Sequence, residues 1–262
     1  MKKIYLLLPV VFLFGAINAQ FRLGTSYSLS VPQQAMADNI RSTHSFNLSF
    51  FYILPGAFDR LVIGTELGIG CYAHVTKEQE LIMSDSSSVM TDVIYSSNVF
   101  NAAFTMRGNL VRKGKVIPYV NAKAGISNFF SNVYVEDPEY ESGCKALERK
   151  SIINDNTFFM SYGGGLVLDL NLFAKKVEQG KCQFDISVNK IKGGNLNYIN
   201  TKNIQSHHHT DPVNTAQDEK AEPVNVKFIN VTTQTIHEHQ VAELYNSPLR
   251  MIDVRVGMLF RL

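Results

Sequence analysis

The chain has 262 residues, of which 45% are hydrophobic and 18% are charged, and its formal net charge is +2. This composition is typical of a folded protein, because disordered chains are poorer in apolar residues and richer in charge. The mean hydropathy of −0.04 is too low for a bundle of membrane-spanning helices. The near-zero charge argues against a nucleic-acid partner, since phosphate binding needs a clustered positive excess.

The first 19 residues predict a signal peptide. Two lysines precede a nearly continuous apolar stretch over 4–17, and the small residues that end at Ala19 are typical of a cleavage site. The apolar stretch is shorter than the roughly 20 residues that a membrane-spanning helix needs. Cleavage removes two of the 25 basic residues, so that the mature chain 20–262 balances its 23 acidic residues. We expect the protein to leave the cytoplasm.

From residue 20 onward apolar and polar residues alternate with a period of two, which is typical of strands whose faces meet different environments. In the second segment, Phe46 and Phe50 alternate with Asn47 and Ser49. In the seventh, the pattern slips at Gly193-Gly194, where we expect a β-bulge. Eight segments follow one another along the chain: 20–31, 43–54, 61–76, 91–110, 116–134, 157–170, 181–200 and 249–262.

The connections between these segments alternate in length. The short ones are 55–60, 111–115 and 171–180, and the long ones are 32–42, 77–90, 135–156 and 201–248. Short turns at one rim and long loops at the other, on an even number of antiparallel strands, are typical of outer-membrane barrels. The sequence therefore predicts an all-β, eight-stranded, antiparallel up-and-down transmembrane barrel. Its mature termini lie at the periplasmic rim and its long loops are extracellular.

The two faces of the predicted wall differ in composition. One is almost wholly apolar and the other carries Ser, Gly, Asn and a few charges, which favours lipid outside and a polar lumen that side chains fill. Buried charges should pair, because unpaired ones are costly. The alternative is a soluble barrel or sandwich with its charges in water. The predicted lumen charge network comprises Arg22, Glu66, Arg107, Lys123, Asp169, Asp185, Asp253 and Arg255.

The signal peptide, the alternating strands and the last nine residues, VRVGMLFRL, resemble small bacterial outer-membrane β-barrels of the OmpA/OmpX type and the PorT-type family. The resemblance implies a place in the outer membrane of a Gram-negative cell. It implies outer-membrane lipid, periplasmic chaperones and the barrel-assembly machinery as partners. It also implies that Phe260 and Leu262 form the assembly signal, although Leu replaces the usual final Phe.

Aromatic residues should mark the rims of such a barrel, where they lie at the level of the lipid headgroups. The chain has no Trp, so Tyr and Phe must serve. At the outer rim the candidates are Tyr95, Phe129, Phe130 and Tyr198.

The long loop 201–248 holds five of the seven histidines. Imidazole suits divalent transition metals, so these residues are weak metal candidates. Neighbouring residues in an extended strand point to opposite faces, however, so three adjacent histidines cannot all converge on one ion. We therefore interpret the loop as a solvated surface loop and expect no metal or cofactor. Renewed alternation over 224–236 predicts a β-arm. The histidines are His207, His208, His209, His237 and His239.

A lipid-modifying enzyme or protease at the rim would need a histidine beside a Ser or Asp. His44 and His74 lie near the outer ends of adjacent segments, but the predicted alternation puts them on opposite faces of the wall. We therefore expect no enzyme. Cys71 and Cys182 fall on lipid-facing positions, and a bridge between Cys71 and Cys144 stays open.

These patterns favour a non-enzymatic barrel with a structural role, or a role in surface recognition or adhesion through its extracellular loops and an unidentified ligand. An accessory subunit of a secretion or transport complex is an alternative, and a rim-sited enzyme is another. A passive pore is disfavoured, because eight strands leave too narrow a lumen.

Overall fold

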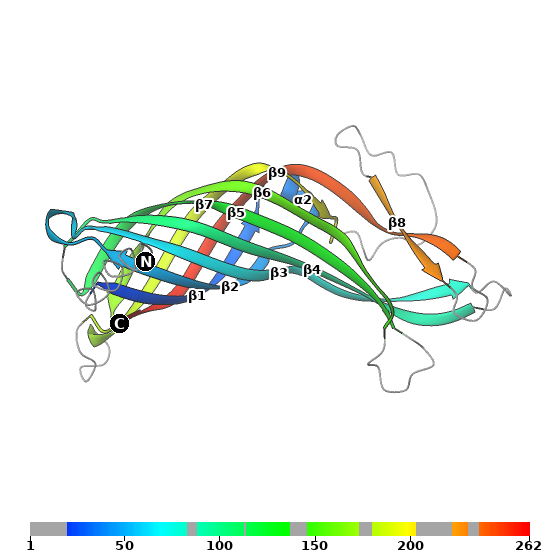
Figure 1. Cartoon of the computed structure of the whole chain (residues 1–262), viewed down its shortest axis with the longest axis horizontal. Helices are drawn as coiled ribbons and strands as arrows, with labels where there is room; N and C mark the ends of the chain where they lie inside the picture. Colours follow the sequence, from blue (N-terminus) through cyan, green and yellow to red (C-terminus); the bar gives the residue numbers. More distant parts are fainter. Residues whose placement is uncertain are drawn as a thin grey trace, which may run out of the picture.

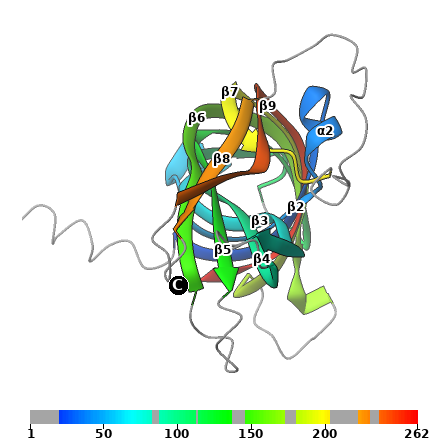
Figure 2. The same ribbon diagram turned by 90° about the vertical axis from the view of Figure 1, so that its right-hand side faces the viewer.

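One antiparallel sheet of nine strands, in the order β1-β2-β3-β4-β5-β6-β7-β9-β8, makes up the fold, and β1 also pairs with β9 (Figure 1). Eight strands therefore close into the predicted barrel, and β8 pairs with β9 outside the ring (Figure 2). The computed structural model describes residues 20–82, 88–112, 114–136, 146–172, 180–202, 222–229 and 236–262. The predicted signal peptide and His207–His209 lie outside them.

The strands of the barrel wall are long, and short 3₁₀ turns and one small helix connect some of them. The first half contains β1 (Phe21–Pro32), α2 (Ala35–Asn39), β2 (Thr43–Ile53), η1 (Gly56–Phe58), β3 (Leu61–Ile82) and β4 (Ser88–Asn109). The second half contains β5 (Val116–Glu136), β6 (Ala146–Asp169), η2 (Leu170–Leu172), β7 (Cys182–Ile199), β8 (Glu222–Ile229) and β9 (Ile236–Arg261). No helix in these described ranges is long and apolar enough to cross a membrane.

The outer face of the wall is apolar and the lumen is polar, as the alternation predicts. Ser28, Asn47 and Ser49 are buried inside, while their chain neighbours point outward. A soluble barrel would reverse this arrangement, because its apolar face would have to leave water. The large apolar side chains exposed on the outside include Tyr27, Phe46, Phe50, Leu67, Ile69, Phe100, Phe104, Val120, Ile126, Phe158, Met160, Leu166, Val188, Val254 and Val256.

Several strands run far beyond their predicted ends. β3 and β4 have 22 residues each, and their pairing continues to Ile82 opposite Ser88, inside the predicted loop 77–90. β6 begins at Ala146, within the predicted loop 135–156. The alternation fades there because outward positions become polar, as at Asn154 and Asn156, while backbone pairing goes on. These extensions form the curved sheet that runs past the closed barrel in Figure 1.

The predicted loop 201–248 is likewise part strand. β8 pairs with the first half of β9, from Ile229 opposite Ile236 to Glu222 opposite Leu244. The β-arm predicted over 224–236 is therefore a two-stranded ribbon that starts two residues earlier and continues into the last barrel strand. His237 and His239 lie on this part of β9.

The pairing of the wall strands has several register shifts, two of which bear on the predictions. The expected bulge at Gly193-Gly194 is present as a register shift between Lys192 and Asn195. A second shift, between Cys71 and Ala73, was not predicted. It moves His74 to the outside, where it is exposed opposite Ser96, so the prediction that His44 and His74 face opposite sides is wrong.

Three of the four aromatic residues assigned to an outer girdle lie inside the barrel instead. Tyr95 and Phe129 are 1% exposed and Tyr198 is 0% exposed. Tyr95 and Phe129 follow the inward parity of their strands, and Tyr198 follows the shift at Gly193-Gly194. The lumen at this end is therefore filled by rings, and only the outward Phe130 keeps a position compatible with a girdle.

Candidate functional site: the closed lumen

Nearest the rim that holds both termini, the lumen contains an ion pair stacked on aromatic rings. The Arg107 guanidinium on β4 donates to the Asp185 carboxylate on β7 at 2.7 Å. The Tyr119 hydroxyl on β5 donates to the other oxygen of Asp185 at 2.6 Å. The guanidinium carbon lies 3.8 Å from the centre of the Tyr119 ring and 4.8 Å from that of Phe51. The cation is thus both paired and sandwiched, which holds it rigidly.

Gly165 makes room for the Tyr119 side chain. It pairs with Tyr119 across β5 and β6, and a Cβ at this glycine would lie 2.6 Å from the Tyr119 hydroxyl oxygen. It would also lie 2.3 Å from the carbonyl oxygen of Ile186. Any larger residue at position 165 would collide with the tyrosine side chain, so glycine here lets the Tyr119 ring reach Asp185.

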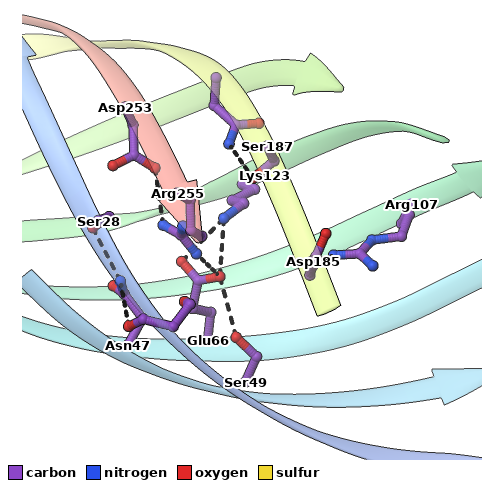
Figure 3. A network of polar contacts seen from close by, with 12 residues as sticks. Ser28, Asn47, Ser49, Glu66, Arg107, Lys123, Asp185, Ser187, Asp253 and Arg255 are labelled. Atoms are coloured by element: carbon purple, nitrogen blue, oxygen red, sulfur yellow. Dashed lines mark hydrogen bonds and ion pairs between the residues drawn. The ribbon is translucent and has the colours of Figure 1, made fainter. Parts of the chain in front are cut away.

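A four-charge cluster occupies the middle of the lumen (Figure 3). The Glu66 carboxylate on β3 accepts bonds from the Lys123 ammonium on β5 at 2.9 and 3.1 Å. It also accepts a bond from the Arg255 guanidinium on β9. Arg255 donates in turn to Asp253 at 3.0 Å. The two carboxylates and two cations balance, so the burial of all four is compensated.

Hydroxyl groups complete this cluster from the neighbouring strands. Ser49 on β2 donates to Glu66 at 3.3 Å, and Ser30 on β1 donates to Asp253 at 2.8 Å. Glu66 and Lys123 are each 7% exposed and Asp253 is 2% exposed. Both carboxylates of the cluster, Glu66 and Asp253, already accept hydrogen bonds from its cations. It ties five strands together across the lumen.

The two remaining members of the predicted network lie apart from these pairs. The Arg22 guanidinium donates to the amide oxygen of Gln183 at 2.5 Å rather than to an acid. Asp169 accepts the backbone N–H groups of Asn171 and Gly180, at 3.0 and 2.7 Å. It therefore holds the turn between β6 and β7 at the rim, where it is 2% exposed.

Above the charges, an apolar cluster closes the other end of the barrel. Met36 and Ile40, from α2 and the residue after it, are 1% and 0% exposed and pack with Phe129, Leu196 and Tyr198. Asn39 fixes this segment to the end of β7, since its carbonyl accepts the N–H of Thr201 at 2.9 Å. The connection between β1 and β2 thus acts as a plug at the upper end of the lumen.

Little open space is left inside. The cavity beside the four-charge cluster has about 30 Å³ of room for the centres of water molecules, and one near Arg22 and Arg107 has about 10 Å³. One water needs roughly 10–15 Å³ of such space, so the larger cavity holds about two waters. Side chains fill most of the described lumen around these two cavities.

Sequence reasoning missed Tyr119, Ser49 and Ser30 as partners of the charges. Alternation places each of them on the lumen face. Their partners lie on other strands, and only the register across the barrel decides which side chains meet. The useful signal was the glycine opposite Tyr119, because a large lumen side chain needs a small residue beside it.

The other candidate residues lie elsewhere. His44 is exposed on the outer face, and its Nδ1 shares a 2.5 Å hydrogen bond with the Tyr27 hydroxyl. Cys71 and Cys182 are free thiols at partly exposed positions, and Cys144 lies outside the described residues. Within the described part of the chain, no group of three or more His, Cys, Asp or Glu side chains could hold a metal ion.

The two residues of the predicted assembly signal lie at the end of β9. Phe260 is 37% exposed on the outer face, opposite Leu23 on β1 and Cys182 on β7. Leu262 follows the strand and is 64% exposed.

Replacing Tyr119 with Phe should lower the free energy of unfolding by about 1.5–3 kcal/mol, because Asp185 loses a hydrogen bond while the ring under Arg107 remains. Replacing it with Leu should cost more, since the cation–π contact goes as well. Urea unfolding of the protein folded in lipid vesicles measures both. Equal stability of Tyr119→Phe and the unchanged protein would contradict a structural role for the hydroxyl.

No known protein family matches the chain, and no curated protein matches its sequence. Solved structures with a similar arrangement include Neisserial surface protein A, which is 8% identical with a TM-score of 0.44. The alignment covers 92% of this chain and 97% of that one. Ail, the attachment invasion locus protein of Yersinia pestis, in complex with the heparin analogue sucrose octasulfate, is 11% identical with a TM-score of 0.31. Here 93% and 97% of the two chains are covered. The outer membrane protease OmpT from Escherichia coli is 8% identical with a TM-score of 0.37, over 94% and 96% of the chains. The likeness concerns the arrangement of strands alone.

Proposed function

We propose that the protein is a bacterial outer-membrane barrel with a non-enzymatic role, structural or in surface recognition, and that the sheet projecting beyond the barrel carries the recognition surface. The observation that carries this proposal is a lumen filled with paired charges and apolar side chains inside an apolar wall. Such a wall suits lipid, and such a lumen offers no path for solutes. What remains for function is the part outside the barrel.

The length of the strands supports this role for the projecting sheet. A tilted strand crosses a bilayer with about 9–11 residues. β3 and β4 have 22 residues each and β9 has 26. At roughly 3.3 Å per residue, the additional length of β3 and β4 extends the sheet by about 36–43 Å along the strands. A paired sheet of this length presents its far end at a fixed height, unlike a flexible loop.

The positions of the chain ends suggest which rim faces out. Arg22 pairs with Arg261, so both ends of the mature barrel lie at the rim with the short connections. In outer-membrane barrels the short turns are periplasmic. The projecting sheet, the β8–β9 ribbon and α2 are then extracellular.

Heat-modifiability on detergent gels tests the barrel and its location. Purified outer membranes should yield a band that migrates anomalously until the sample is boiled, because a closed barrel resists detergent. Protease added to intact cells should cut within 201–248 and leave the N-terminal barrel strands intact. Recovery of the protein in a soluble periplasmic extract would contradict the proposal.

Planar-bilayer recording separates a closed barrel from a pore. We expect no steady conductance in the nanosiemens range from the reconstituted protein, since the lumen holds room for about two waters beside the charge cluster. A porin reconstituted in the same way provides the positive control. Steady nanosiemens channels would overturn the closed-lumen proposal and favour a transport role.

A further inference from the structure

A group of three cations lies on the outer face of the wall. Beyond Val188, the next outward positions of β7 are Lys190 and Lys192, and both are exposed. Arg250 on β9 also points outward, because its neighbours Leu249 and Met251 are buried in the lumen. Lys192 and Arg250 are direct cross-strand partners.

The arrangement is unfavourable unless an anion joins it. Like charges directly opposite one another on two strands repel. None of the three side chains forms an ion pair with a described carboxylate, whereas the lumen cations Lys123, Arg107 and Arg255 each do. Among the described residues, carboxylates thus compensate these three lumen cations, whereas they leave the outward group of positive charge unbalanced.

On β7 and β9 this group lies where the outward side chains change from apolar to polar, whereas on the neighbouring β6 the exposed Phe158 lies farther from the rim with the termini. Toward the rim with the termini, the next outward residues are the paired Val188 and Val254, and away from it they include Asn197 and Asn246. Tyr162 pairs with Lys190, and the Lys192 ammonium lies 5.9 Å from the centre of the Tyr162 ring. Tyrosine is typical of the level where lipid chains meet headgroups.

We propose that Lys190, Lys192 and Arg250 bind the phosphate group of an outer-leaflet lipid, whose acyl chains lie along Val188 and Val254. The proposal rests on the outer-membrane placement proposed above. Cations on a membrane protein at headgroup level attract anionic lipid. Arg250 supplies a planar fork that suits a phosphate, and the two lysines supply further positive charge. The apolar side chains below fit a lipid rather than a soluble phosphate.

The absence of Trp from the chain provides a clean measurement. A single Met160→Trp substitution places a fluorophore on the outer face directly opposite Lys192. The full mature protein is reconstituted in phosphatidylcholine vesicles that contain either brominated phosphatidic acid or brominated phosphatidylcholine, and quenching gives the relative association of each lipid. We expect a preference of at least about fivefold for phosphatidic acid, which corresponds to roughly one favourable cation–lipid contact.

One test variant and two controls make the result specific. Lys190→Gln, Lys192→Gln and Arg250→Gln together should reduce the preference to about onefold. A second variant removes the same amount of charge from the other rim, by Arg60→Gln, Lys115→Gln and Lys181→Gln. This variant should leave the preference for phosphatidic acid unchanged. An Ile69→Trp reporter on β3, which is four strands from β7 in either direction around the ring, should show no preference.

The outcomes that overturn the proposal are distinct. Equal quenching by both lipids at Met160→Trp, or a preference that survives loss of the three cations, shows that these residues bind no lipid phosphate. Displacement of the lipid by inorganic phosphate at matched ionic strength shows a site for soluble phosphate instead. If neither lipid quenches the reporter, the wall is not in the bilayer, and the outer-membrane placement itself then fails.

Discussion

Replacing Glu66 with Ala should destabilise the barrel by about 3–5 kcal/mol, the cost of leaving buried cations without their partner. Lys123 and Arg255 both donate to this carboxylate, and Asp253 alone then faces two cations. The change should appear as a lower urea midpoint for the protein folded in vesicles, and as loss of the heat-modifiable band at a lower temperature.

A second substitution separates charge from lost volume. Adding Lys123→Met to Glu66→Ala removes one orphaned cation, and the double variant should be more stable than Glu66→Ala alone. Ser49→Ala, which removes only a 3.3 Å bond to the same carboxylate, should cost about 1 kcal/mol. If Glu66→Ala proves no more harmful than Ser49→Ala, the cluster does not stabilise the barrel.

Replacing Ile40 with Asp should release the plug from the upper lumen while the barrel stays closed. Ile40 is 0% exposed among apolar side chains, and an unpaired carboxylate there costs several kcal/mol, about 3–5 in comparable buried sites. The strand pairings of the wall do not involve this residue. We therefore expect protease to cut within 33–42, with the heat-modifiable band still present.

Ile40→Val is the matched control, because it keeps an apolar side chain and should cost only about 0.5–1.5 kcal/mol. Its segment 33–42 should resist protease as in the unchanged protein. If Ile40→Asp is equally resistant, the segment is held by its hydrogen bonds to β7 rather than by packing.

The sequence alone was enough to predict the barrel, its eight strands and its two faces. Period-two alternation reports which side chains share a face, and this physical signal is strong wherever one face meets lipid. The same parity also places Tyr95 and Phe129 inside, so assigning them to a girdle contradicted the pattern.

Other features depend on information that alternation does not carry. The extensions of β3 and β6 were missed because strands with water on the outside lose the apolar half of the pattern. The unpredicted shift between Cys71 and Ala73 reversed the face of His74. Which lumen charges pair depends on how far each strand is staggered relative to the others around the barrel. Knowing which residues face inward does not determine this stagger.

The place of Arg255 and Asp253 on the last strand has a consequence for the order of assembly. β9 is made last and meets β1 at the closing seam. Until it arrives, Glu66 and Lys123 lack half of their cluster and stay hydrated. A slip of β9 by one residue would turn both of its charges toward lipid. Only the correct register between β9 and β1 pairs all four charges as they leave water. The cluster therefore disfavours closure of the barrel in a wrong register.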